Sequence, residues 1–123
     1  MELRHHDFKG KRALLADDEE GVRLVLRMLL EFLGLDVTEA VDAEEALACY
    51  RSEKFDFVLT DYKMPRKCGD VLALEIKTLN PHQRVVMISG YAGRLLQDGK
   101  LPACIDRLLP KPCTLNQLAE ALE

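Results

Sequence analysis

The sequence predicts a single α/β domain in which short parallel strands alternate with helices. The chain has 123 residues, enough for one hydrophobic core but too few for two. Its apolar runs are mostly continuous rather than alternating in polarity, which is typical of strands buried on both faces of a parallel sheet. Helical patterns with short connections separate these runs. We therefore predict an open (βα)5 three-layer sandwich with right-handed crossovers and the flavodoxin-like strand order 2-1-3-4-5.

The predicted strands are short runs rich in apolar residues, at 13–16, 37–41, 55–60, 85–89 and 105–109. The third run combines β-branched and aromatic residues over the length of a core strand, with Asp56 as its one charged interruption. Pro65 then stops regular structure. Asp61 therefore lies where a buried strand reaches the edge of the sheet.

The clearest predicted helix covers residues 22–33. Five apolar side chains recur at helical spacing and would form its inner face: Val22, Val25, Leu26, Leu29 and Leu33. Gly34 is placed to end this helix.

Two further helices carry clear boundary signals. One begins at Asp42, and Glu45 three residues later completes a capping box. The other covers about residues 70–79 and is closed by Asn80 and Pro81.

The last helix begins with a capping box made by Thr114 and Gln117. Its predicted inner face consists of Leu115, Leu118, Ala119 and Leu122. The segment 91–100 contains Gly93 and Gly99 and shows little periodicity, so we expect a short, mobile fourth helix there.

Composition excludes several classes of function. A net charge of −4 and a pI near 5.4 disfavour direct binding to nucleic acid or to an anionic membrane. The N-terminus begins with charges rather than an apolar targeting segment, and the longest apolar stretch is too interrupted by charges to span a membrane. The four cysteines lack CxxC spacing, so we expect reduced thiols rather than a metal or redox site. We predict a cytoplasmic domain over residues 12–123, preceded by an N-terminal arm over residues 1–11.

Polar residues follow four of the predicted strands. Asp17 and Asp18 follow the first strand, Asp61 the third, Ser89 ends the fourth, and Lys111 follows the fifth. Each has an ordinary explanation when taken alone, such as favourable charge at a helix start. Ligands of open α/β sheets, however, bind beyond the carboxyl ends of the strands, and this fold brings these residues to one edge.

Three carboxylates at one edge would raise one another's pKa unless a cation intervened. Oxygen ligands at a partly solvated edge suit Mg²⁺, which takes one or two carboxylates plus phosphate oxygens. Lys111 and Ser89 supply the charge and the hydroxyl that would hold a phosphoryl anion. Since no GxxxxGK[ST] motif occurs, we expect the phosphoryl group on Asp61 rather than on a nucleotide.

Four segments, in this order and spacing, resemble the receiver domain of two-component response regulators: ALLADDEE, FDFVLTDYKMP, VVMISGYA and LLPKP. Gly69, eight residues past Asp61, belongs to the same pattern. The resemblance covers about residues 12–122, and it implies a phosphorylation switch.

The resemblance implies a set of metal and acceptor residues. Asp61 would be the phosphoacceptor, and Asp17 and Asp18 would help to bind Mg²⁺ or Mn²⁺ with Asp61. The backbone carbonyl of Lys63 is the expected third protein ligand. Lys63 and Tyr91 also occupy positions that tune the lifetime of the acyl phosphate in this family.

The resemblance also implies a switch. Ser89 matches the hydroxyl that moves to the phosphoryl oxygen, and Lys111 matches the lysine that pairs with it. The Lys111–Pro112 bond resembles the family's cis peptide. Leu108 stands where the family usually has a switch aromatic, so we expect phosphorylation to move the segment 90–99 while Leu108 stays in one rotamer.

The implied phosphodonor is a histidine kinase or a histidine phosphotransfer protein, and an output domain or a second copy of the chain is the implied downstream partner. The domain would catalyse only its own phosphorylation and dephosphorylation, so it is not expected to be an enzyme. SGYA after the fourth strand favours a receiver of a hybrid sensor kinase, although a transcription factor or a free-standing regulator is also compatible.

Two alternatives remain at this point. An aspartyl-nucleophile phosphohydrolase uses similar groups, but it carries a second acid two residues past the nucleophile, where this chain has Lys63. A phosphorylation-independent interaction module would not need the complete acidic set with Ser89 and Lys111. Leu108 at the switch position keeps this second alternative open.

Overall fold

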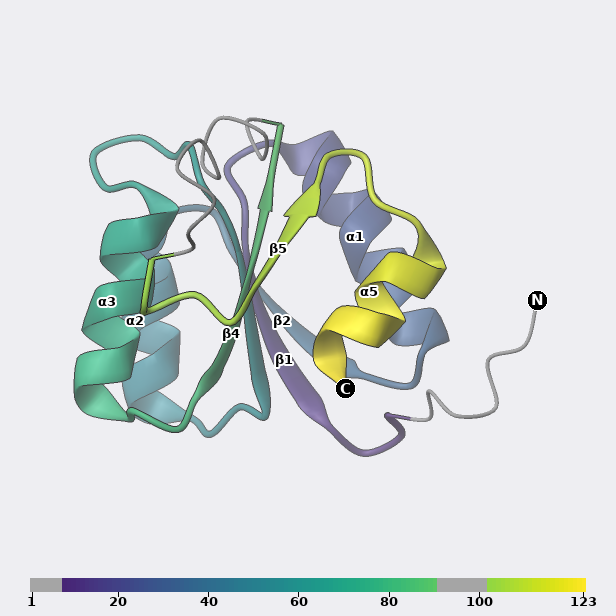
Figure 1. The fold of residues 1–123 in the computed structure, drawn as a ribbon, viewed down its shortest axis with the longest axis horizontal. Coiled ribbons are helices and arrows are strands. Elements are labelled where there is room, and N and C mark those ends of the chain that lie inside the picture. Colours follow the sequence, from purple (N-terminus) through teal and green to yellow (C-terminus); the bar gives the residue numbers. More distant parts are fainter. Residues whose placement is uncertain (1–7, 91–101) are drawn as a thin grey trace.

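The computed structural model describes residues 8–90 and 102–123 of the chain. Within these residues, parallel strands form one sheet in the order β2-β1-β3-β4-β5, as predicted. The strands are β1 (Arg12–Ala16), β2 (Asp36–Ala40), β3 (Phe57–Asp61), β4 (Arg84–Ser89) and β5 (Arg107–Pro110). Figure 1 shows α1 (Glu20–Phe32) and α5 (Leu115–Leu122) on one face of the sheet, and α2 (Ala43–Ser52) and α3 (Gly69–Leu79) on the other. The predicted three-layer sandwich is confirmed.

Each face of the sheet has its own apolar core, because helices cover both sides of a parallel sheet. Successive strand residues enter opposite cores, as the two-residue period of a strand requires. Leu15 and Leu59 pack toward α1 and α5, whereas Leu14 and Val58 pack toward α2 and α3. This two-sided burial explains why the strand runs in the sequence are continuous.

The inner face of α1 differs from the predicted one at two positions, Val25 and Leu30, and is otherwise confirmed. Leu26, Leu30 and Leu33 are buried, whereas Val25, predicted to face the core, is 56% exposed. Apolar residues occur nearly all round this helix, so more than one set of positions satisfies helical spacing. Packing against the sheet selects the set that contains Leu30.

Asp42 and Thr114 cap the two helices that were predicted to begin with them. The Asp42 carboxylate accepts the backbone N–H of Glu45 at 2.8 Å. Glu45 accepts the N–H of Val41 rather than that of Asp42, so this capping box is displaced by one residue. Thr114 and Gln117 form the complete capping box that was predicted for α5. The predicted fourth helix falls in residues 91–101, outside the described part of the chain.

Two predicted strands begin too early. The runs 55–60 and 105–109 correspond to β3 and β5, which begin at Phe57 and Arg107. The aspartates just before them, Asp56 and Asp106, accept backbone N–H groups of neighbouring strands with their side chains. The apolar pattern of the sequence had predicted both aspartates to be strand residues.

Phe8, in the predicted N-terminal arm, packs against the domain. Its ring is buried and lies edge-on to the ring of Phe57, with 5.7 Å between the ring centroids. The N–H of Phe8 donates to the carbonyl of Leu33 at 3.1 Å. Phe8 thus contributes to the core on the α1 and α5 side.

Among the described residues, no helix has the length and apolar content that a membrane span requires.

Glu39 of β2 connects the sheet to α1. Its carboxylate accepts a hydrogen bond from Arg23 Nε at 2.9 Å and another from Arg27. Burial raises the pKa of Glu39, but the bonds from Arg27 and Arg23 outweigh it and hold the pKa below its ordinary value. The pair of arginines therefore stabilises the ionised carboxylate and fixes the first turns of α1 to the sheet.

We predict that Glu39→Gln destabilises the domain at neutral pH by about 1 kcal/mol, the upper range for partly exposed ion pairs. A carboxyl whose pKa is lowered by folding stabilises the protein above its unfolded pKa, and that contribution is lost as the pH falls through the folded value. The difference from wild type should therefore disappear in acid. Urea unfolding at pH 7 and pH 3 measures this, with the exposed Glu44→Gln as control. An equal difference at both pH values would contradict the assignment.

Candidate functional site

The candidate site lies at the carboxyl edge of the sheet. Asp61 is the last residue of β3 and Ser89 the last of β4, while Asp17 and Lys111 follow β1 and β5 directly. Asp17, Asp61 and Ser89 are buried, with 1%, 6% and 1% of their surfaces exposed. The sequence prediction that these side chains share one edge is confirmed.

Lys111 holds the two buried carboxylates together. Its Nζ lies 3.0 Å from Oδ2 of Asp17 and 3.0 Å from Oδ2 of Asp61. Glu19 is a more distant third partner, with Oε1 at 3.8 Å from the same nitrogen. The other oxygen of Asp17, Oδ1, accepts the backbone N–H of Glu19 at 2.9 Å. One cation therefore serves two buried anions.

The pKa values reflect this shared charge. Burial raises the pKa of Asp61 above its ordinary value, and the nearby charge of Asp17 adds to the effect, although Lys111 opposes both. Burial lowers the pKa of Lys111, but its close contacts with the carboxylates of Asp17 and Asp61 outweigh that and raise the pKa overall. Lys111 alone therefore does not fully neutralise the pair of carboxylates, and a second cation would be favoured here.

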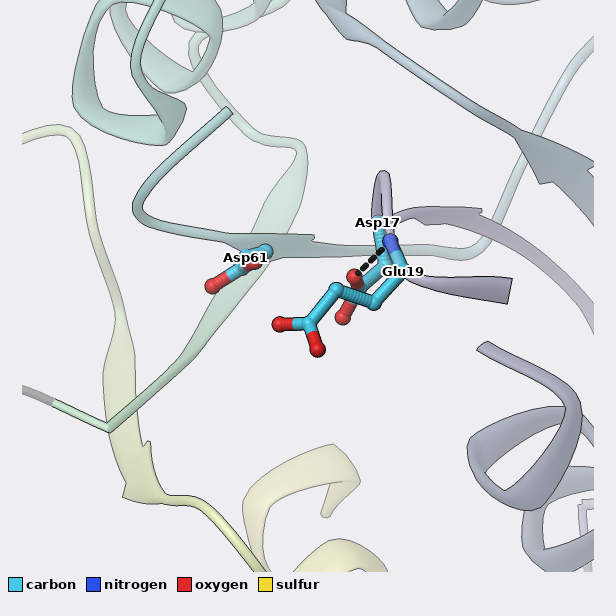
Figure 2. A group of neighbouring side chains, drawn as sticks. All are labelled: Asp17, Glu19 and Asp61. Carbon is cyan, nitrogen blue, oxygen red and sulfur yellow. Dashed lines mark hydrogen bonds between the residues drawn. The ribbon is translucent and has the colours of Figure 1, made fainter. Parts of the chain in front are cut away.

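The carboxylates converge as cation ligands would. Ligand oxygens of Asp17, Glu19 and Asp61 all lie within 4.8 Å of one another, and Figure 2 shows the three side chains facing a common space. Oδ2 of Asp17 is buried and makes its ion pair with Lys111, but it has no hydrogen bond within the described residues. An oxygen in this state, beside two further carboxylates, fits a hard divalent cation such as Mg²⁺.

The cluster differs in one member from the predicted ligand set. Asp18 is exposed and lines a cavity of about 750 Å³ over the site, together with Asp61, Lys63, Gly90 and Lys111. Glu19, which was not among the predicted ligands, is the third carboxylate of the cluster, and the ligand role of Asp18 stays a prediction. Within an acidic run that leaves a strand and enters a helix, only the turn geometry determines which carboxylates point inward.

The other predicted features of the site are one cis peptide bond and the residues Lys63, Leu108 and Tyr91. The Lys111–Pro112 peptide is cis, as the resemblance implied. Lys63 lies on the cavity wall, and the ligand role of its carbonyl stays a prediction. Leu108 is half-buried against the core on the α2 and α3 face. Tyr91 lies outside the described residues.

Comparisons with known proteins agree with this geometry. The family model of the response regulator receiver domain matches residues 13–123. The chain belongs to this receiver family.

Relatives of this receiver domain include both short and long proteins. The response regulator receiver protein CpdR of Brucella abortus is 31% identical over 113 residues, which are 92% of this chain and 94% of CpdR. The autoinducer 1 sensor kinase/phosphatase LuxN of Vibrio campbellii is 33% identical over 109 residues, which are 89% of this chain but 13% of LuxN. The chain thus spans a small part of some relatives and nearly all of others.

Solved structures show the same fold. The response regulator TrrA of Thermotoga maritima, in complex with Mg²⁺ and BeF, superposes with a TM-score of 0.81. It is 27% identical, and the match covers 89% of this chain and 94% of that one. A sensor protein from Polaromonas, 22% identical over 92% of this chain and 93% of its own, superposes with a TM-score of 0.84 and shows the likeness of fold alone.

Gly69 allows the receiver domain to bring α3 against the end of β3. Its N–H donates to the carbonyl of Tyr62 at 2.7 Å. A β-carbon at Gly69 would lie 2.0 Å from the carbonyl oxygen of Asp61, closer than any side chain can approach. Thr60 donates its hydroxyl to that same oxygen at 2.9 Å. The backbone of Asp61 is therefore fixed from two sides, and only glycine fits.

We predict that Gly69→Ala destabilises the domain by about 1–3 kcal/mol, because the methyl group must displace the Asp61 backbone. Gly21→Ala is the matched control, since a β-carbon there meets nothing within 4 Å. In that helical position alanine should be neutral or stabilising. Thermal unfolding of the two variants measures the contrast, and similar melting temperatures would contradict the close-contact argument.

Proposed function

We propose that this receiver domain accepts a phosphoryl group on Asp61 from the phosphohistidine of a histidine kinase or a histidine phosphotransfer protein. The observation that carries this proposal is the lysine shared between Asp61 and Asp17, two carboxylates that are almost fully buried. Burying two carboxylates beside one lysine costs free energy, and a functional role for these groups explains why the fold keeps them. Phosphorylation then switches the domain between two states that an output domain or a partner distinguishes.

The chemistry assigned to the chain is nucleophilic attack and charge positioning. A carboxylate oxygen of Asp61 attacks phosphorus in line, forming the P–O bond as the P–N bond of phosphohistidine breaks. The departing imidazole nitrogen keeps the bonding electron pair and takes a proton from solvent or from its own protein. Lys111 neutralises charge on the transferring oxygens and orients Asp61. A bound Mg²⁺ would supply further charge neutralisation and hold the phosphoryl oxygens.

The acidic cluster supports the Mg²⁺ part of the proposal. Asp17, Asp61 and Glu19 offer carboxylate oxygens, and Asp18 and Lys63 line the same cavity. The complex of TrrA with Mg²⁺ and BeF belongs to that protein, and its similarity to this chain favours the same ion here. Mn²⁺ has the same preference for oxygen ligands.

The alternatives are weaker on specific grounds. A phosphohydrolase of the aspartyl type would need a second acid two residues past Asp61, where Lys63 stands. We therefore propose a signalling domain that catalyses only its own phosphorylation and dephosphorylation. A module that only binds partners would gain nothing from burying Asp61 beside the charge of Asp17, which raises the pKa of Asp61.

The switch is assigned to Ser89 and Lys111. Lys111 pairs with the Asp61 carboxylate at 3.0 Å, and the phosphoryl oxygens of an acyl phosphate would add contacts to Lys111 and Ser89 that the carboxylate alone does not make. Ser89 ends β4 directly before the segment 90–99, which we propose moves on phosphorylation. Leu108 is opposite Met87 in the β4–β5 register and packs into the core, which supports its staying in place.

The phosphodonor is proposed to dock on α1. Four large apolar side chains of this helix are more than half exposed: Leu24, Val25, Met28 and Phe32. The helix begins directly after Glu19, so this apolar face leads from the phosphorylation site along one side of the molecule. Helical phosphodonors bury such faces by packing helix against helix.

The bacterial relatives and the charge of the chain support a cytoplasmic location, where this transfer would occur.

We predict that incubation with acetyl phosphate and Mg²⁺ adds one phosphoryl group that hydroxylamine removes, because it is an acyl phosphate. Asp61→Asn should abolish the modification, and a chelator should reduce it at least about tenfold. Intact-mass spectrometry measures both, with the exposed Asp36→Asn as control. A phosphoryl group that persists in Asp61→Asn would remove Asp61 from its proposed role.

We predict that Phe32→Glu slows phosphotransfer from the cognate kinase at least about tenfold, because interface hot spots typically contribute 2 kcal/mol or more. Phosphorylation by acetyl phosphate should be unchanged, since Phe32 is far along α1 from Asp61. Leu74→Glu, on the exposed face of α3, is the matched control. Equal slowing with both donors, or equal slowing by the control, would contradict docking on α1.

A further inference from the structure

Two aspartates occupy equivalent places at the opposite edge of the sheet. Asp56 lies five residues before Asp61, and Asp106 lies five residues before Lys111. At about 3.3 Å per strand residue, each is roughly 16 Å from the site residue that its strand carries. Neither takes part in the chemistry proposed above.

Asp56 forms a closed pair of hydrogen bonds with Arg12 at the start of β1. The N–H of Asp56 donates to the carbonyl of Arg12 at 2.9 Å. The carboxylate of Asp56 accepts the N–H of Arg12 at 2.8 Å. The β1–β3 ladder then continues from Ala13 opposite Phe57 to Ala16 opposite Thr60. The two bonds therefore start this ladder in one register.

Asp106 makes the same pair of bonds with Val85 in β4. Its N–H donates to the carbonyl of Val85 at 2.9 Å, and its carboxylate accepts the N–H of Val85 at 2.7 Å. Lys77 of α3 adds an ion pair at 2.8 Å from the same carboxylate oxygen. The β4–β5 ladder continues from Val86 opposite Arg107 to Ser89 opposite Pro110, directly before Lys111.

The aspartate at the start of β2 does not make this arrangement. Asp36 also donates its N–H to the preceding strand, to the carbonyl of Lys11 at 2.9 Å. Its side chain is 78% exposed and lies 3.9 Å from the guanidinium of Arg12. Strand β2 carries none of the residues assigned to the site, so the paired bonds occur on the two strands that deliver Asp61 and Lys111.

We propose that Asp56 and Asp106 are positioning residues for phosphoryl transfer, which set the places of Asp61 and Lys111 by fixing the register of β3 on β1 and of β5 on β4. Asp56 and Asp106 act on different pairs of site residues. Asp56 sets Asp61 against Asp17, which follows β1, whereas Asp106 sets Lys111 against β4 and Ser89. Because both bonds of each pair form in one register only, a displaced strand loses them together.

This inference rests on the proposed phosphorylation of Asp61, and the two variants have different expected effects. Asp56→Ala should weaken Mg²⁺ binding and slow phosphorylation by acetyl phosphate, each about tenfold, because displaced carboxylates serve both. Asp106→Ala should slow phosphorylation about tenfold and shift the NMR signal of the Lys111 side chain, but leave Mg²⁺ affinity at or above that of wild type. Rates are compared at a temperature where circular dichroism shows each variant folded.

Conservative variants separate positioning from general stability. Asp56→Asn and Asp106→Asn keep an oxygen that accepts the same N–H, so they should restore most of the lost rate. Lys77→Met removes the ion pair of Asp106 but not the backbone bonds, so it should lower stability without shifting the Lys111 signal. Asp36→Ala should change neither Mg²⁺ affinity nor rate. If the alanine variants do not fold, Asp56→Glu and Asp106→Glu take their place. Their carboxylates lie one methylene further from the backbone, and their rates are compared with those of the Asn variants.

Equal losses of Mg²⁺ affinity in the Asp56 and Asp106 variants would overturn the inference, as would a failure of the Asn variants to restore the rate. An effect of Asp36→Ala as large as theirs would also overturn it. If wild type takes no phosphoryl group on Asp61, the proposed function fails. The Mg²⁺ titrations and the Lys111 signal then still decide whether these aspartates position the site.

Discussion

The site depends on one lysine that serves two buried carboxylates. Lys111 lies 3.0 Å from both Asp17 and Asp61. Removing a charge from water costs several kcal/mol unless a partner and hydrogen bonds compensate, and here one cation compensates two anions incompletely. The raised pKa of Asp61 is the result of that incomplete compensation. The same imbalance favours a divalent cation and, after phosphotransfer, contacts to the new phosphoryl oxygens.

The rest of the fold holds these three groups in place. They come from three strands, β1, β3 and β5, and no two of these groups are near in sequence. Their distances therefore depend on strand register, which the paired bonds of Asp56 and Asp106 set at the far edge. At the near edge, Gly69 lets α3 contact the Asp61 backbone so closely that no other residue fits. The carboxylate is thus controlled from both ends of its strand.

Helix α1 connects this site to the surface of the domain. Arg23 and Arg27 fix it to Glu39 of β2, while its outer face leaves Met28 and Phe32 exposed. A helix held rigidly on one side and apolar on the other is a preorganised surface for a helical partner. The relatives range from short regulators to long sensor kinases, and a self-contained site beside such a surface is compatible with both settings.

Much of the fold and of the site follows from local sequence. Continuous apolar runs determined the parallel sheet, the capping residue Thr114 determined a helix start, and polar residues after the runs identified Asp61 and Lys111. These features are local because a strand, a cap and a strand end each involve a few neighbouring residues. Parallel topology then brings the strand ends to one edge without further information.

Tertiary structure decided what local pattern left open. It turned α1 to bury Leu30 rather than Val25, and it brought Glu19 rather than Asp18 into the carboxylate cluster. It also gave Asp56, in sequence only a charge within an apolar run, a backbone partner 44 residues away. In each case the local sequence offers more than one residue, or more than one role, that fits the same pattern. Only contacts between distant segments distinguish such positions, because the energy of packing and of hydrogen bonding belongs to both partners.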